Sequence, residues 1–461
     1  MRSTHSPLKY LRQIAIGAAT GLLLLVLIIG GFTLAAPAKS GATNTPSTSP
    51  TDSPTVSPTP EGRDCSVADL AADPRLLGLH AQVINPLTNE VLFDVQGDVP
   101  AQTASVMKLL TATAALQVLG PNYRVQTKVY ADLDVPGQIV IIGAGDPTLS
   151  RTRAGVQSVY KDAPKLSDLG VQINEWAKAT PIRNIVLDST YFAPEGWDPG
   201  NPETERTIGY QSLVSALQVD GDRDNPTRET SPRSADPVNR VGVALKKAIG
   251  PLASSSTLTQ EKAGSNLLEI ASVKSEPISK WIEHMLQVSD NTEAEFLARL
   301  VSKQLGYSGS RDSVDVAMKA ALTRAGLATA GLVLKDGSGS NEENQVSATL
   351  INALLKKVLN EDGDLGVIKR ALPISAESGS LASRFKGDNL DAAGKIFAKT
   401  GWTRHEYSLA GIITAKDKTD LVFSIAAIGE VNATAKDAID NLATGIYRCG
   451  NKLSAEIKPK N

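Results

Sequence analysis

Strand-like segments lie at both ends of the globular part of this 461-residue chain, and helical segments lie between them. Near the start, 79–85 and 90–95 flank the turn-forming residues 86–89, a pattern that predicts a hairpin. Near the end, three successive strands are expected, at 396–400, 408–415 and 421–428. Short connections between successive strands favour antiparallel pairing. The sequence therefore predicts an α+β fold whose antiparallel sheet takes strands from both ends of the chain and is flanked by helices.

The chain has only two cysteines, Cys65 and Cys449, which lie at opposite ends of the same region. In an exported protein such a pair can form a disulfide that ties the two ends together. Two separate buried thiols are the alternative. We expect the disulfide, because the N-terminus predicts export.

The N-terminal segment differs from the rest of the chain. Residues 1–12 carry three Lys or Arg side chains, and 13–36 carries no charge. About 20 apolar residues can span a bilayer, whereas the apolar core of a signal peptide usually has about 7 to 15. The basic flank predicts a cytoplasmic tail at 1–12 and outward transfer of the remainder. We expect 13–36 to be a membrane anchor, with a signal segment cleaved near 36–38 as the alternative.

Composition adds two expectations. Residues 37–62 are rich in Ser, Thr and Pro, which predicts an extended stalk rather than a packed core. The whole chain has a net charge of −2 and only 4% aromatic residues. Neither a basic surface nor aromatic stacking on nucleic acid is therefore expected, and we predict no nucleic-acid partner.

Three short motifs follow one another along the chain: Ser-x-x-Lys at 105–108, Ser-Asp-Asn at 289–291 and Lys-Thr-Gly at 399–401. Ser-x-x-Lys alone is weak evidence, since three further copies start at Ser6, Ser158 and Ser383. The copy at 105–108 differs because it opens a predicted helix over 105–119, where backbone N–H groups can stabilise an oxyanion. The non-catalytic alternatives are a solvated lysine, a helix N-cap and a strand end.

The three motifs together supply the parts of a serine nucleophile. A serine hydroxyl needs a base, and Lys108 lies one helical turn from Ser105. Burial and a second cation, Lys399, would lower the pKa of Lys108 enough for this role. Ser289 would pass the proton to a leaving amine. Asn291 would orient Lys108 and hold a substrate amide.

The strand that carries Lys399 is expected to bind substrate. Thr400 and Gly401 belong to this predicted binding strand, and Lys399 with Thr400 would hold a substrate carboxylate. The backbone N–H of Trp402 would be the second oxyanion donor, beside the N–H of Ser105.

No cofactor is expected from the sequence. The four histidines show no metal-ligand spacing. The Gly-rich segment 336–339 lacks the Lys-Ser/Thr pair of a phosphate-binding loop. We therefore predict neither a metal nor a cofactor.

In these motifs the chain resembles the D-alanyl-D-alanine carboxypeptidase/endopeptidase family of class C low-molecular-mass penicillin-binding proteins, peptidase family S13. Further segments are similar to parts of that family: Gly143–Leu149, Ser215–Leu217 with Asp220, and Asp336–Gly339. The gap between Lys108 and Ser289 is much longer than in class A β-lactamases. The chain departs from the family at Trp402, where a small or hydroxylated residue is common, and at 340–344, where relatives tend to carry an arginine.

The resemblance implies a serine β-lactamase/DD-peptidase-like fold. Residues 63–123 and 274–455 would form the penicillin-binding, transpeptidase-like domain, and 124–273 an inserted mixed α/β domain. It also implies an exported serine DD-peptidase that cleaves D-Ala-D-Ala in peptidoglycan stem peptides through a Ser105 acyl-enzyme and is inhibited by β-lactam antibiotics. Two alternatives remain. A β-lactamase would need a deacylating Glu, for which 292–398 offers no Glu-x-x-Leu-Asn segment, and the third possibility is a cell-wall scaffold without activity.

Overall fold

The computed structural model describes residues 62–454. The predicted cytoplasmic tail and anchor, and the stalk up to residue 61, lie outside the described residues. Among the residues that are described, no helix combines the length and the apolar character needed to cross a bilayer.

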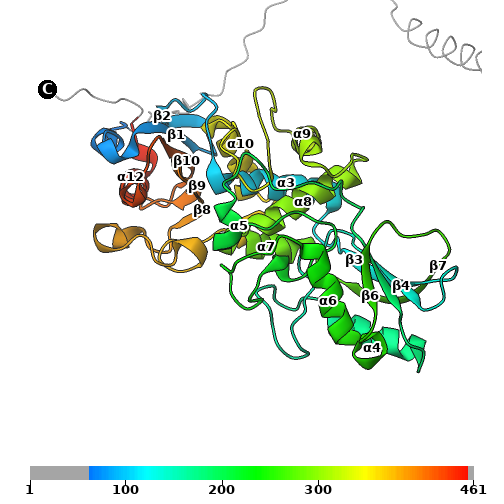
Figure 1. Ribbon diagram of the computed structural model, residues 1–461. Helices are drawn as coiled ribbons and strands as arrows, with labels where there is room; N and C mark the ends of the chain where they lie inside the picture. Colours follow the sequence, from blue (N-terminus) through cyan, green and yellow to red (C-terminus); the bar gives the residue numbers. More distant parts are fainter. Residues whose placement is uncertain (1–61, 455–461) are drawn as a thin grey trace, which may run out of the picture. The chain divides into compact units, whose positions relative to one another are not determined.

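An antiparallel sheet with strand order β2-β1-β10-β9-β8 joins the two ends of the described region (Figure 1). Its register pairs His80 of β1 with Ala426 of β10, and Thr400 of β8 with Leu409 of β9. The predicted hairpin and the three late strands are therefore confirmed as parts of one sheet. The strands are β1 (Gly78–Asn85), β2 (Glu90–Val95), β8 (Ile396–Thr403), β9 (Glu406–Thr414) and β10 (Asp420–Ile428).

A disulfide between Cys65 and Cys449 links the same two ends, with the Cα atoms 5.4 Å apart. Cys65 also pairs with Leu453 in a parallel bridge. The expected pairing of the two cysteines is thus present.

Helices cover both faces of this sheet. On one face, α12 (Ala433–Cys449) packs its apolar side, including Ile439 and Leu442, on strand residues such as Phe423. On the other face lies a helical layer built around α3 (Met107–Leu119), which is almost entirely buried. This position explains the Ala- and Leu-rich composition of α3. The remaining helices of the layer are α7 (Ile278–Val288), α8 (Asn291–Gln304), α9 (Val314–Arg324), α10 (Ala348–Leu359) and α11 (Gly366–Ala371).

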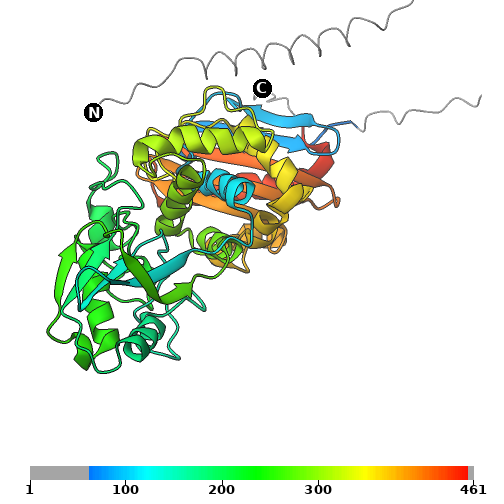
Figure 2. The same ribbon diagram turned by 90° about the vertical axis from the view of Figure 1, so that its right-hand side faces the viewer.

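A second sheet is formed between α3 and α7 in the chain, with strand order β6-β5-β4-β3-β7. Strands β4, β5 and β6 are parallel, whereas β3 is antiparallel to both β4 and β7. Figure 2 shows this sheet and its helices beside the helical layer of the first sheet. Its elements are β3 (Gln126–Asp132), β4 (Gln138–Ile142), α4 (Leu166–Ala177), β5 (Asn184–Asp188), α5 (Thr204–Ile208), α6 (Pro237–Ile249), β6 (Thr257–Gln260) and β7 (Leu267–Lys274).

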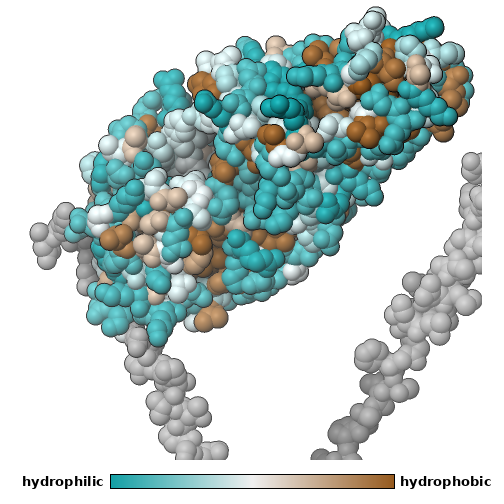
Figure 3. Space-filling view, turned by 90° about the horizontal axis from the view of Figure 1, so that it is seen from below, coloured by the Kyte–Doolittle hydropathy of each residue, from teal (hydrophilic) through white to brown (hydrophobic). Residues whose placement is uncertain are grey.

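The surface face in Figure 3 carries mostly hydrophilic residues, and its apolar residues lie in small scattered groups. This distribution is normal for a surface exposed to water.

Candidate active site

Ser105 and Lys108 lie where the chain enters α3. Ser105 belongs to a 3₁₀ turn, η2 (Ala104–Val106), and Lys108 is the second residue of α3. The Nζ atom of Lys108 lies 2.8 Å from Ser105 Oγ and 2.6 Å from Asn291 Oδ1. The predicted helix start at Ser105 is therefore a tight 3₁₀ turn followed by the α-helix proper.

The Ser-Asp-Asn motif forms the junction between α7 and α8. Ser289 ends α7 in the left-handed conformation with φ of 65°. Asp290 caps α8 by accepting a hydrogen bond from the N–H of Glu293 at 3.0 Å. This sharp change of direction points Ser289 and Asn291 toward the two lysines, while Asp290 points away from them.

Lys399 and its neighbours lie on β8, the edge strand of the first sheet. Lys399 Nζ donates to Ser289 Oγ at 2.8 Å and to the carbonyl of Thr400 at 2.8 Å. The Thr400 hydroxyl donates to Ser380 Oγ at 2.8 Å. The structure thus brings Ser105, Lys108 and Asn291 into one chain of contacts and Ser289 with Lys399 into a second.

Gly401 lets β8 lie close to η2, the turn that carries Ser105 and is called the nucleophile turn below. A Cβ atom at this position would lie 2.1 Å from Ser408 Oγ and 2.9 Å from the carbonyl oxygen of Thr103. The next residue, Trp402, is 56% exposed and stacks on Tyr407. Because side chains alternate along a strand, the Trp402 indole lies on the face opposite the nucleophile turn. Its bulk therefore does not fill the space beside Ser105.

Both lysines are completely buried, and this burial sets their charge. Burial lowers the pKa of Lys108 to about 8, against the opposing effect of Asp336, Asp290 and Glu295. Burial and the nearby Lys108 cation hold the pKa of Lys399 well below its usual value. A neutral Lys108 amine is therefore accessible near pH 8, within hydrogen-bonding distance of Ser105 Oγ.

A third segment supports Lys108. The carbonyl of Ser338 accepts a hydrogen bond from Lys108 Nζ at 2.8 Å. The backbone N–H groups of Gly337 and Ser338 donate to the buried Glu295 carboxylate at 3.1 and 2.9 Å. From the sequence, this Gly-rich segment shows a family likeness and lacks the features of a phosphate-binding loop, but it shows no sign of contact with Lys108. Its support of Lys108 was missed, and the run of Gly and Ser around Asp336 was the available signal.

Comparisons with known proteins agree with this geometry. The sequence model of the D-Ala-D-Ala carboxypeptidase 3 (S13) family matches residues 64–249 and 222–446. The chain belongs to the S13 family. A carboxypeptidase of Mycobacterium tuberculosis is 33% identical over 396 residues, covering 84% of each chain. Carboxypeptidase DacB of Mycolicibacterium smegmatis is 32% identical over 469 residues, covering 97% of this chain and 98% of the relative.

Solved structures support the fold assignment. Penicillin-binding protein 4 of Haemophilus influenzae superposes with a TM-score of 0.71 at 18% identity, covering 83% of this chain and 99% of that chain. Its complex with a β-lactam superposes with a TM-score of 0.62. The predicted α+β, DD-peptidase-like fold of this S13 protein is therefore confirmed.

Asp290 of the S13 protein makes a buried ion pair that the sequence did not predict. Arg223 Nη2 lies 2.6 Å from Asp290 Oδ2, and the side chains are 2% and 1% exposed. Arg223 also donates to the Tyr160 hydroxyl at 2.7 Å. Burial alone would raise the pKa of Asp290, but Arg223 and His284 hold it well below its usual value. The region that carries the second sheet thus anchors the Ser-Asp-Asn junction.

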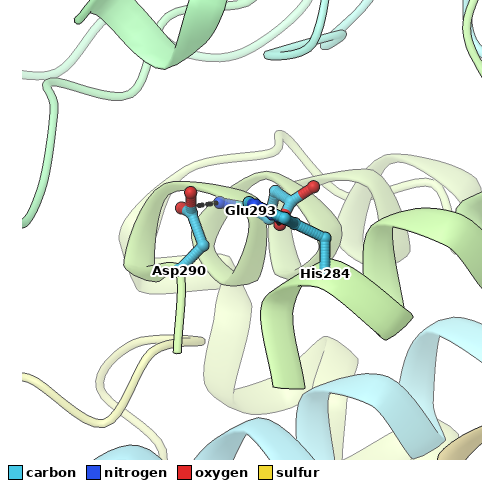
Figure 4. Close-up of side chains that lie close together, drawn as sticks. All are labelled: His284, Asp290 and Glu293. Carbon is cyan, nitrogen blue, oxygen red and sulfur yellow. Dashed lines mark hydrogen bonds and ion pairs between the residues drawn. The ribbon is translucent and has the colours of Figure 1, made fainter. Parts of the chain in front are cut away.

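His284, Asp290 and Glu293 converge beside this ion pair, with their possible ligand atoms within 4.8 Å of one another (Figure 4). Sequence spacing gave no sign of this cluster. His284 Nδ1 lies 2.6 Å from Glu293, and its Nε2 lies 3.1 Å from Glu229. Burial would lower the pKa of His284, but the surrounding carboxylates raise it to about 11. His284 and Arg223 are thus cations that lie against these carboxylates.

Proposed function

We propose that this S13 family member is a serine DD-peptidase that acts outside the cytoplasm on peptidoglycan stem peptides. It would cleave the D-Ala-D-Ala bond, as a carboxypeptidase, an endopeptidase or both. The observation that carries the proposal is the position of Lys108 Nζ, within hydrogen-bonding distance of both Ser105 Oγ and Asn291 Oδ1. The curated relatives from two mycobacterial species are named carboxypeptidases, and they cover most of this chain.

The proposed acylation step follows from these contacts. Ser105 Oγ attacks the carbonyl carbon of the penultimate D-Ala and gives its proton to neutral Lys108. The N–H groups of Ser105 and Trp402 stabilise the oxyanion that forms. Ser289 passes a proton to the leaving amine, so terminal D-Ala departs and an ester remains on Ser105. Water then hydrolyses this ester and releases the shortened stem peptide.

Substrate recognition would centre on the β8 edge. Lys399 and Thr400 would hold the terminal carboxylate, Gly401 lets the peptide lie against the strand, and Asn291 would bind a substrate amide. A β-lactam would acylate Ser105 in the same way and remain attached. Penicillin-binding protein 4 of Haemophilus influenzae, which has this fold, has been solved with a β-lactam.

Domain organisation and location complete the proposal. Residues 63–123 and 274–455 would form the catalytic domain, with 124–273 as an inserted domain that anchors the Ser-Asp-Asn junction through Arg223. Residues 13–36 would hold the protein at the membrane, or would direct its export if cleaved. Fractionation of cells, followed by N-terminal sequencing of the mature chain, distinguishes these two locations.

The decisive experiment measures D-alanine release from a synthetic pentapeptide stem, together with labelling by a fluorescent penicillin. Wild type should release D-alanine and be labelled, and Ser105→Ala should do neither. Equal labelling of Ser105→Ala would contradict the proposed nucleophile. Product analysis after digestion of cross-linked peptidoglycan then shows how the activity divides between carboxypeptidase and endopeptidase.

A further inference from the structure

Glu406, the first residue of β9, carries a fully buried carboxyl. Neither carboxyl oxygen makes a hydrogen bond to any residue that the structure describes. Burial of a polar group without a hydrogen bond is unfavourable, and considerably more so if the group is charged. The residues around Glu406 should therefore explain why a carboxyl is buried at this position.

Those surroundings are the nucleophile turn. Glu406 and Ser408 share one face of β9, because side chains two residues apart on a strand point the same way. Ser408 Oγ donates to the carbonyl of Thr103 at 3.0 Å, so this face packs against η2. The Ala104 N–H and the Ser408 hydroxyl lie near enough to the Glu406 carboxyl to influence its ionisation, although neither forms a hydrogen bond of normal geometry.

The turn itself is strained. Ala104, immediately before Ser105, has a φ of 40°, a left-handed conformation that is unfavourable for a non-glycine residue. Its carbonyl is approached so closely by Gly339 that a Cβ there would lie 1.8 Å away. A strained backbone persists only where its neighbours hold it. Glu406 is a buried neighbour of this turn, close enough for the Ala104 N–H to lower its pKa.

The charges around Glu406 are few. The residues of η2 carry none. On β8, Thr403 pairs with Glu406, and Lys399 lies on the same face four residues earlier. From the segment after Gly339, Glu342 adds negative charge and is itself paired with His405 at 2.8 Å. No described cation forms an ion pair with Glu406, so the neutral carboxyl is the form that this site accepts.

We propose that Glu406 is a positioning residue: its neutral carboxyl supports the strained Ala104 turn, and loss of its proton displaces the turn and slows acylation of Ser105. This inference rests on the proposed function, since it takes Ser105 as the nucleophile. Burial raises the pKa of Glu406 to about 8, with Ser408 and Ala104 opposing the rise and Glu342 adding to it. Acylation should therefore rise with pH as Lys108 loses its proton and fall as Glu406 loses its own.

The test is the second-order rate of acylation by a fluorescent penicillin from pH 6 to 10. Wild type should give a bell-shaped profile. Glu406→Gln, which keeps the shape and an acceptor oxygen but cannot ionise, should keep the rising limb and lose the alkaline fall. Glu361→Gln, which removes an exposed carboxylate, is the control and should retain the full bell.

A second variant separates positioning from simple core packing. Glu406→Met fills a similar volume without a polar end facing η2, so it should fold and acylate about tenfold more slowly than Glu406→Gln at pH 7, because small displacements of a nucleophile cost rate steeply. Equal rates for these two variants, or an alkaline fall retained in Glu406→Gln, would overturn the inference. Absence of labelling in wild type at every pH would instead contradict the proposed function.

Discussion

Two buried carboxyls, Asp290 at the Ser-Asp-Asn junction and Glu406 at the start of β9, have opposite environments. Asp290 has a guanidinium 2.6 Å away and a protonated histidine beside it, whereas no described cation forms an ion pair with Glu406. The first is therefore held ionised and the second neutral. Although both carboxyls are buried, Asp290 thus forms a permanent ion pair at the Ser-Asp-Asn junction, whereas Glu406 at the nucleophile turn can gain or lose a proton.

The largest expected effect comes from removing the Arg223–Asp290 ion pair. Arg223→Met leaves Asp290 buried without its cation and should cost about 3 to 5 kcal/mol in the free energy of unfolding, measured by urea denaturation. Adding Asp290→Asn should recover part of that loss, because the unpaired charge disappears. Arg228→Met, which removes an exposed arginine of the same segment, is the control. A loss below about 1 kcal/mol for Arg223→Met would show that the junction does not depend on this ion pair.

At the nucleophile turn, an added side-chain atom rather than a lost charge should reduce the rate of acylation. Gly401→Ala would place a Cβ 2.1 Å from Ser408 Oγ and 2.9 Å from the Thr103 carbonyl oxygen, so the turn before Ser105 must move. We expect penicillin acylation to fall about 100-fold, the scale associated with misplacement of a reacting group by about 1 Å. Gly196→Ala, where a Cβ meets nothing within 4 Å, should acylate at the wild-type rate. Similar rates for both variants would mean that the turn is not held by this contact.

The sequence predicted the sheet and the three motifs much better than the buried residues that support them. The hairpin and the three late strands follow from local alternation and turn residues. The three motifs were identifiable because each is a short string. The Cys65–Cys449 pairing was predictable because there was no other pair to choose.

The supporting residues had no such local signature. Arg223 reaches Asp290 across 67 residues of sequence, and an arginine in a polar loop gives no sign of that contact. Glu406 sits in an otherwise ordinary strand start, where a charged residue indicates solvent rather than burial. The left-handed Ala104 also has no sequence signal, because the glycines packed against it, Gly339 and Gly401, are distant in the chain.

The two carboxyls should also affect stability in opposite pH ranges. The pKa of Glu406 rises from 4.5 to about 8 on folding, so the folded state loses stability as the pH rises through that window. The pKa of Asp290 falls below 3.8, so its contribution is present above that value and is lost as the pH drops below it. Glu406→Gln should therefore gain at least about 1 kcal/mol relative to wild type between pH 5 and 9, since one pKa unit corresponds to about 1.4 kcal/mol. Denaturant unfolding at both pH values checks this, and a constant difference would show that Glu406 does not titrate in the folded protein.

The smallest effect should come from Glu342, whose negative charge helps to keep Glu406 protonated. Glu342→Gln removes that repulsion, so the pKa of Glu406 should fall and the alkaline loss of acylation should begin at a lower pH. Because Glu342 is partly exposed and paired with His405, screening should limit the shift to about half a pH unit. Glu343→Gln, which removes the neighbouring and more exposed carboxylate paired with Lys335, should leave the profile in place. A shift of the profile toward higher pH in Glu342→Gln would contradict the expected repulsion between the two carboxyls. The group that titrates in the alkaline limb would then not be Glu406.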